Sequence, residues 1–145
     1  MSFPTPEAGL VIRYSYLWLH EHRGGREEGI KDRPCAIVLT VHDDGGGTRV
    51  LVVPVTHSPP ENPDAALEVP LAVKRHLGLD SERSWVVLTE SNLFDWPGPD
   101  LRRIDDRDSS SVAYGFLPPQ FFAALRRRFV ALEVGVRAGR VTRTE

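Results

Sequence analysis

The sequence has little of what marks a secreted protein, a membrane protein or a metal-cluster protein. Its 145 residues hold a single cysteine, Cys35, which excludes an intrachain disulfide and disfavours a thiolate metal cluster. The longest apolar runs, Ala36–Val41 and Val50–Val55, are far too short to span a bilayer. The N-terminus lacks a basic segment followed by an apolar one, so it does not resemble a signal peptide. These features predict a cytoplasmic protein with no membrane partner.

The chain also lacks an excess of positive charge. It has 18 Lys and Arg against 20 Asp and Glu, giving a formal net charge of −2 and a pI of about 6.2. Domains that hold nucleic acid by overall charge usually have a pI above roughly 9. Any binding of nucleic acid must therefore come from a local patch.

Several motifs of cofactor and metal enzymes are missing. No GxGxxG or Walker-type phosphate loop is present, because Gly45–Gly47 lies between two apolar runs and not before a helix. No HExxH occurs, and His20 and His22 have no obvious third ligand nearby in the sequence. Cys35 follows a proline and begins an apolar run, which favours a small core residue over a nucleophile. We expect no metal and no cofactor.

The pattern of apolar residues and turn residues predicts short strands followed by one helix. The predicted strands are Gly9–Leu19, Cys35–His42, Thr48–Thr56, Leu67–Val73 and Ser84–Thr89. Asp43–Gly47 is a hairpin turn, and the other connections are a charged loop over His20–Lys31, a turn over Lys74–Leu79 and a loop over Asn92–Gly98. Leu117–Arg137 has helical spacing of its apolar residues.

This order of elements indicates one domain over residues 9–138, preceded by a flexible leader at 1–8 and followed by a frayed tail at 139–145. Short strands joined by short, helix-free connections disfavour a parallel α/β fold. The expected fold is mainly β, a small antiparallel β-barrel with a C-terminal helix packed on it.

Two polar residues stand at the ends of the central hairpin. Pro34 favours an extended conformation at Arg33, which stands at the start of one strand. Thr56 ends the return strand, so the hairpin sets it beside Arg33. An arginine in this position can meet a phosphate with two hydrogen bonds, although a structural ion pair of Arg33 with Asp32 or a nearby glutamate is the alternative.

The order of these features resembles the MazF/PemK family of toxin endoribonucleases. The residues that carry the resemblance are the opening strand Gly9–Tyr14, Glu28 five residues before Arg33-Pro34, the Val-Pro-x-Thr of Val53–Thr56, the strand Val86–Glu90 and the helix over Leu117–Leu132. The chain departs from the family pattern at Leu10 and Gly29, where the family usually has Asp and Gln. The resemblance implies the SH3-like barrel that MazF, PemK and CcdB toxins share.

The resemblance also implies an activity and a site. Such toxins cleave single-stranded RNA without a metal, using the RNA's own 2′-hydroxyl as nucleophile and leaving a 2′,3′-cyclic phosphate. Arg33 and Thr56 match the catalytic arginine and threonine. The proton-transfer group is open between His57, Glu28 and Arg33 itself, and a side chain at 57 should point away from Thr56 if the strand continues.

The resemblance further implies partners for the chain. The family forms homodimers, binds RNA in a groove and is blocked by an antitoxin with an acidic segment. Polar and basic residues around the proposed site could contact RNA or such a segment: Arg23, Arg26, Lys31 and Ser58. Tyr16 could stack on a base, although packing in the core or a dimer interface is the commoner role of a strand tyrosine.

Two other functions fit the same fold. A gyrase-poisoning toxin on this barrel would need a tryptophan near the C-terminus, whereas the last tryptophan here is Trp96. A catalytically inactive SH3-like binding module would not need both Arg33 and Thr56. Both features favour the ribonuclease interpretation.

Overall fold

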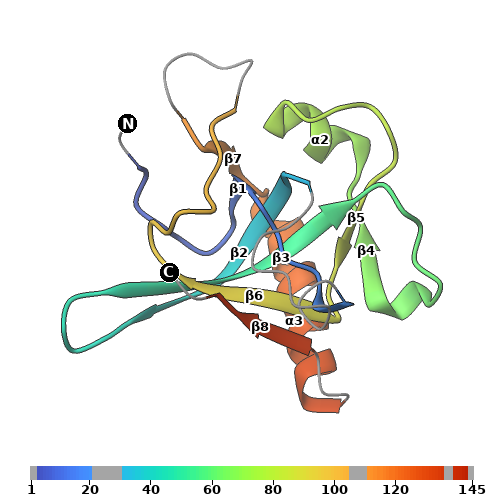
Figure 1. Ribbon diagram of the computed structural model, residues 1–145. Helices are drawn as coiled ribbons and strands as arrows, with labels where there is room; N and C mark the ends of the chain where they lie inside the picture. The colour runs from blue at the N-terminus through green and yellow to red at the C-terminus, as the bar shows by residue number, and fades with distance from the viewer. Residues whose placement is uncertain (1–2, 21–30, 105–110, 136–138, 144–145) are drawn as a thin grey trace.

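A computed structural model shows a curved β-sheet flanked by helices (Figure 1). The structure describes residues 3–20, 31–104, 111–135 and 139–143. The strands are β1 (Leu10–Tyr14), β2 (Arg33–His42), β3 (Thr48–Thr56), β4 (Ala66–Glu68), β5 (Trp85–Val87), β6 (Glu90–Asp95), β7 (Ala113–Phe116) and β8 (Gly139–Thr142). The helices are the 3₁₀ helix η1 (Pro63–Ala65) and the α-helices α2 (Leu71–Leu77) and α3 (Pro119–Gly135).

The β2–β3 hairpin is the central pair of the sheet and projects to one side of the molecule (Figure 1). The Asp43 carboxylate closes its turn by accepting the backbone N–H of Gly47 at 2.8 Å. Gly46 has a φ of +88°, a left-handed conformation that glycine adopts without strain. The strands pair antiparallel, with Cys35 opposite Pro54. The predicted hairpin is confirmed.

The sheet runs in the order β4-β5-β3-β2-β1-β7, and β3 also pairs with β6. All these pairs are antiparallel, whereas β6 and β8 pair in parallel. Among the described residues β4 and β7 do not pair with each other, so the sheet is not closed into a barrel. The mainly β fold with a helix near the C-terminus is confirmed in this open form.

The segment between β4 and β5 differs from the prediction. The sequence predicts a strand up to Val73 and a turn from Lys74 onward, whereas both residues belong to α2. Val73 and Leu77 are buried one helical turn apart, and in so short a run apolar spacing fits a strand as well as a helix. Pro70 precedes the helix, and Gly78 ends it in a left-handed conformation with a φ of +71°.

Three strands near the C-terminal half were also predicted wrongly or missed. The predicted loop Asn92–Gly98 contains most of β6, the predicted frayed tail from Gly139 contains β8, and no strand was expected at Ala113–Phe116. Val141 is buried, and the backbone N–H of Arg143 donates to a β6 carbonyl at 2.7 Å. These strands exist because distant segments supply their hydrogen bonds, which local sequence does not reveal.

Alternate residues of the strands build two apolar clusters on opposite faces of the sheet. One cluster lies against α3, where Leu125 and Phe129 are buried. The predicted helix over Leu117–Arg137 is confirmed, because α3 begins and ends within two residues of these bounds. On the other face the rings of Tyr14 and Phe94 stack with their centres 4.5 Å apart. Side chains on both faces of the β2–β3 hairpin are therefore packed in an apolar cluster.

A buried ion pair joins Arg143, the residue that follows β8, to Asp100. The side chains of Arg143 and Asp100 are 2% and 8% exposed, and Arg143 Nη2 lies 2.8 Å from Asp100 Oδ2. Arg143 Nη1 also donates to the Ser15 carbonyl at 2.9 Å and to Asn92 Oδ1 at 3.2 Å. A charge can be buried at tolerable cost only when it is paired in this way.

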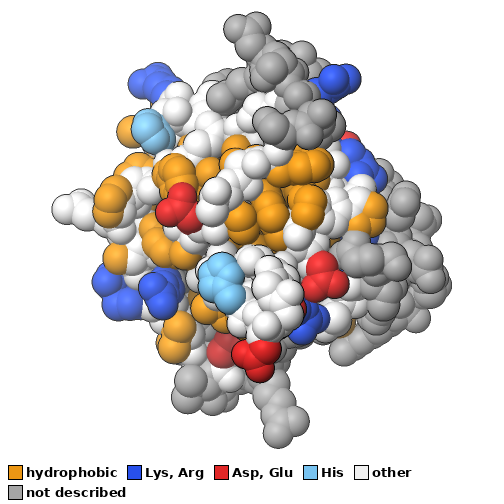
Figure 2. All heavy atoms as spheres, turned by 90° about the vertical axis from the view of Figure 1, so that its left-hand side faces the viewer, with side chains coloured by type: hydrophobic (Ala, Val, Ile, Leu, Met, Phe, Trp, Pro, Cys, Tyr) orange, Lys and Arg blue, Asp and Glu red, His pale blue; other side chains and the backbone are white. Residues whose placement is uncertain are grey.

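Apolar side chains gather on the face toward which the β2–β3 hairpin projects, with charged side chains around them (Figure 2). Leu39 and Val41 of the hairpin are each 45% exposed. None of the helices in the described part of the chain is long and apolar enough to cross a membrane.

Candidate active site

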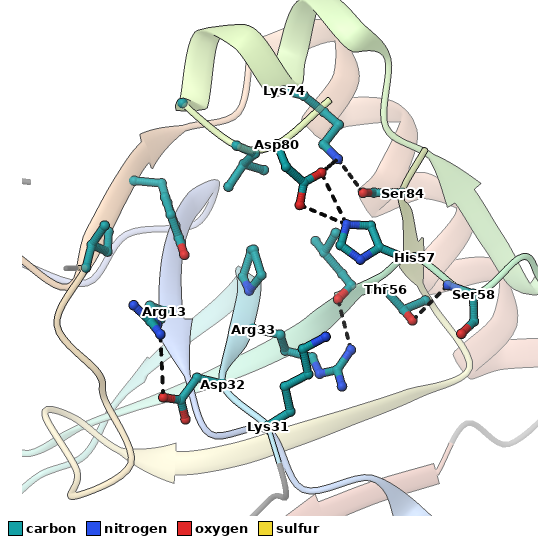
Figure 3. A pocket seen from close by; sticks show the side chains of 16 residues that line it. Arg13, Lys31, Asp32, Arg33, Thr56, His57, Ser58, Lys74, Asp80 and Ser84 are labelled. Atoms are coloured by element: carbon teal, nitrogen blue, oxygen red, sulfur yellow. Dashed lines mark hydrogen bonds and ion pairs between the residues drawn. The ribbon is translucent and has the colours of Figure 1, made fainter. Parts of the chain in front are cut away.

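Arg33 and Thr56 lie opposite each other at the ends of neighbouring strands. Arg33 is the first residue of β2, and Thr56 is the last residue of β3. The ladder pairs Cys35 with Pro54, and the same register continued by two residues sets Arg33 against Thr56. Both residues line one cavity (Figure 3). The proximity that the hairpin predicts is confirmed.

The Arg33 guanidinium is held from two sides. Its Cζ lies 4.9 Å from the centre of the Trp18 ring, in a cation–π contact, and its Nη1 donates to the Val55 carbonyl at 3.3 Å. Its Nε is buried and has no hydrogen-bond partner among the residues that the structure describes. A buried donor without a partner costs about 1–3 kcal/mol.

The neighbouring carboxylate, Asp32, has other partners. Its oxygens lie 3.9 Å from Arg13 Nη2 and 3.5 Å from Arg102 Nε. The alternative in which Asp32 neutralises Arg33 therefore finds no support in the described residues. Arg33 is left with a fork of donors beside an open cavity, the arrangement that suits phosphate.

Thr56 is oriented by the turn that follows it. Its Oγ1 accepts the backbone N–H of Ser58 at 3.1 Å. A hydroxyl that accepts one hydrogen bond still has its own proton to donate, so Thr56 can donate to a ligand oxygen. β3 ends at Thr56, as predicted, so the condition under which His57 would point away from Thr56 is not met, and His57 lines the same cavity as Thr56.

Two cavities meet at Arg33, Thr56 and Ser58, which line both of them. The first has a volume of about 580 Å³ and extends toward α2, with His57 on its wall. The second has a volume of about 600 Å³ and extends along η1, with Trp18 on its wall. An extended ligand could lie across both cavities with its middle over Arg33 and Thr56.

His57 is held by a carboxylate from the loop after α2. Its Nε2 lies 2.9 Å from Asp80 Oδ2 and 3.2 Å from Asp80 Oδ1 (Figure 3). The ammonium of Lys74, whose side chain is 3% exposed, binds Asp80 Oδ1 at 2.5 Å. It also donates to Ser84 Oγ at 2.5 Å and to the Glu82 carbonyl. The three donors of the ammonium are thereby matched by three acceptors.

The surroundings of the Asp80 carboxyl favour its charged form. Partial burial raises its pKa, but the hydrogen bond and positive charge of Lys74, with a further contribution from His57, outweigh that effect. The pKa of Asp80 therefore lies below its ordinary value. Asp80 is an anion at neutral pH and acts as a fixed acceptor for His57.

The same cluster offers possible metal ligands. Ligand atoms of His57, Asp80 and Glu82 all lie within 4.8 Å of one another, and the three residues are exposed. However, the Lys74 ammonium already binds one Asp80 oxygen and would repel a divalent ion at that distance. We assign no metal to this cluster.

The other predicted site residues have different outcomes. Lys31 is exposed and lines the first cavity. Tyr16 is fully buried and donates its hydroxyl to Glu90 Oε1 at 3.2 Å, so the prediction that it contacts RNA is wrong and its role is core packing. Burial also raises the pKa of the Tyr16 hydroxyl, so this group is neutral. Arg23, Arg26 and Glu28 lie outside the described residues.

Cys35 is fully buried, as predicted. Burial raises the pKa of its thiol, although the charges of Arg33 and Arg143 oppose this effect. A protonated thiol without access to a ligand is a poor nucleophile. Covalent catalysis by Cys35 is therefore disfavoured.

Sequence reasoning missed Lys74, Asp80 and Ser84. The one available signal was a lysine next to buried apolar positions of a short helix. Asp80 and Ser84 reach the site because the loop after α2 folds back toward the end of β3, and that contact is between segments more than 20 residues apart in the chain. Local sequence patterns do not encode it.

A scan against models of protein families found no match for this chain, and a search of curated proteins found none either.

Proposed function

We propose that this protein is the toxin of a toxin–antitoxin pair and cleaves single-stranded RNA without a metal. One observation carries the proposal. Arg33 lies opposite Thr56 where two cavities meet. A charged, bidentate donor and a hydroxyl donor on an open groove suit the phosphate of an extended nucleic acid.

The proposed reaction needs no cofactor. The 2′-oxygen of the RNA attacks the neighbouring phosphorus, so that an O2′–P bond forms as the P–O5′ bond breaks. The products are a 2′,3′-cyclic phosphate and a free 5′-hydroxyl. Charge builds up on the non-bridging oxygens in the transition state, where Arg33 supplies a fixed positive charge and Thr56 a hydrogen bond. Donors already in place stabilise this state without having to reorganise.

The side chains that line the two cavities suit an RNA ligand, although the protein as a whole is not basic. Among the described residues, Arg13, Lys31, Arg33 and Lys74 line the first cavity together with the carboxylates of Asp32 and Asp80. The second cavity offers the Trp18 ring, and aromatic rings are the usual platform for unpaired bases. The local patch required by the low pI is thus present at the site.

The family resemblance extends the proposal to fold and partners. We propose that the open sheet is a partly open form of the SH3-like barrel of the MazF and PemK toxins. The apolar face in Figure 2 would support a homodimer, and the hairpin offers two further half-exposed apolar side chains, Leu39 and Val41. An antitoxin with an acidic segment would compete with RNA for the cavities around Arg33. The RNA substrate would place the protein in the cytoplasm.

Incubation of the purified protein with a long single-stranded RNA in EDTA tests the proposed activity. We expect cleavage at a limited set of sites, with 2′,3′-cyclic phosphate on one product and a 5′-hydroxyl on the other. Arg33→Ala should cleave far more slowly than wild type, although circular dichroism should show the same fold. No cleavage of several RNAs by the wild-type protein would contradict the activity and favour a binding module.

A further inference from the structure

We infer that His57 is the general base of the proposed cleavage and that Asp80 and Lys74 position it. The inference deepens the proposed function and rests on it. Figure 3 shows His57 between Asp80 on one side and the Arg33–Thr56 pair on the other. All five residues line the first cavity.

Among the described residues that line this cavity, His57 is the side chain best suited to take a proton. The two lining carboxylates, Asp32 and Asp80, are each held by cations: Asp32 by two arginines and Asp80 by Lys74. The contact with Lys74 stabilises the charged form of Asp80 and weakens this carboxylate as a base. His57 is the one imidazole on this wall, and in its neutral form an imidazole has one nitrogen that can accept a proton.

The contact with Asp80 fixes which nitrogen can act. A carboxylate can only accept, so the Nε2 that lies 2.9 Å from Asp80 Oδ2 must carry the proton. In the neutral ring Nδ1 is then the acceptor. When Nδ1 takes the proton of the 2′-hydroxyl, the imidazolium that forms is stabilised by the Asp80 anion. The leaving O5′ keeps the electron pair of the broken bond and takes a proton from water, and the imidazolium later returns its proton to water.

Lys74 gives this pair the rigidity that a surface pair lacks. An exposed His–Asp contact alone is weak, and the side chains of His57 and Asp80 are 43% and 51% exposed. Lys74 is almost fully buried and clamps Asp80 together with the Glu82 carbonyl and Ser84. Asp80 is therefore fixed before a ligand arrives, which is the requirement for an effective positioning residue.

Kinetics of single substitutions test the inference. His57→Ala should lower kcat by about 10²-fold or more with little change in KM, because a general base typically contributes 10²–10⁴-fold. Added imidazole should restore part of the lost rate in His57→Ala and none in Arg33→Ala. Asp80→Asn should also lower kcat without raising KM, at a temperature where circular dichroism shows the variant folded.

Glu82→Gln is the matched control for Asp80→Asn. Its carboxylate lies 3.6 Å from the same nitrogen, but its side chain is 74% exposed. We expect its kcat to stay close to that of wild type. Cleavage by His57→Ala at the wild-type rate would overturn the inference and leave the proposed ribonuclease activity unaffected. Equal losses in Asp80→Asn and Glu82→Gln would show that the two negative charges act alike on His57, whatever their contact with its Nε2, and would overturn the positioning role.

A readout without RNA separates the two proposals. Nitrogen NMR of the histidine rings, with His57 identified by the signals lost in His57→Ala, should show a proton on Nε2 in the neutral form. A ring protonated on Nδ1 alone would overturn the positioning by Asp80, whatever the activity. A wild-type protein that cleaves no RNA would instead overturn the proposed function, and with it the role of His57 as a base.

Discussion

The Arg33 guanidinium and the Thr56 hydroxyl face one cavity from opposite strands of a single hairpin. Their spacing is set by the β2–β3 ladder, which both apolar clusters anchor. The ring of Trp18 lies against the guanidinium and limits its motion. The pair is therefore organised by the fold before any ligand binds.

Arg33→Lys separates charge from geometry at the site. Lysine keeps the positive charge but loses the planar fork that binds two phosphate oxygens at once. We expect Arg33→Ala to lower the cleavage rate by about 10²–10³-fold and Arg33→Lys to lower it by a smaller factor. Arg49→Ala is the control, because Arg49 lies on the same hairpin with its side chain 40% exposed and pairs with Asp95. Equal rates for wild type and Arg33→Ala would refute the site.

Thr56→Val and Thr56→Ser form a matched pair of substitutions. Valine keeps the shape of threonine but removes the hydroxyl, whereas serine keeps the hydroxyl and its contact with the Ser58 N–H. A hydrogen bond to a charged group is worth about 1.5–3 kcal/mol, so Thr56→Val should lower kcat by about 10- to 10²-fold. Thr56→Ser should retain most of the rate. A serine variant as impaired as the valine variant would argue against a donated hydrogen bond.

Arg143→Met tests the unexpected β8 strand. The substitution leaves the buried Asp100 carboxylate without its partner at 2.8 Å. Breaking a buried ion pair by removing one member typically costs about 3–5 kcal/mol. We expect a loss of that size in the free energy of unfolding, measured with urea. Thr142→Ala, at the exposed last residue of β8 beside Arg143, should change it little. Similar values for both variants would mean that the ion pair that follows β8 contributes little to the stability of the fold.

Asp80 predicts how stability depends on pH. Its pKa is lower in the folded protein than in the unfolded chain, because Lys74 outweighs the effect of burial. The folded state then binds fewer protons, so the contribution of Asp80 is complete above the unfolded pKa of about 3.9 and is lost as pH falls through the lower folded value. The difference in unfolding free energy between wild type and Asp80→Asn should therefore shrink in that acid range. Asp44→Asn, in the exposed hairpin turn, should show no such convergence.

Local signals were enough to predict the central hairpin and the α3 helix. The turn Asp43–Gly47 and the apolar runs on both sides of it were enough to predict that the two strands pair. The irregularity between Ile37 and Leu39, which shifts the register by one residue and sets Arg33 against Thr56, was not predicted. The helix over α3 followed from the spacing of Leu125 and Phe129. In these segments the partners lie close in sequence or repeat with a regular period, so the sequence alone reveals them.

The rest of the fold and site depends on contacts between distant segments. β6 has loop-like residues and becomes a strand only because β3 and β8 flank it. Lys74 and Asp80 reach the site only because the loop after α2 folds back toward His57. The burial of Tyr16 follows from its contacts with residues more than 70 positions away, such as Glu90. None of these pairings leaves a local pattern.

Replacement of one hydroxyl in the substrate tests the central claim most directly. An RNA oligonucleotide that contains a mapped cleavage site is compared with the same oligonucleotide carrying a single 2′-deoxynucleotide on the 5′ side of the scissile phosphate, both in EDTA. If the RNA supplies its own nucleophile at Arg33 and Thr56, the all-ribose substrate is cut to a 2′,3′-cyclic phosphate and the substituted one stays intact. Cleavage of the deoxy-substituted oligonucleotide at the same phosphate and a similar rate would contradict the account.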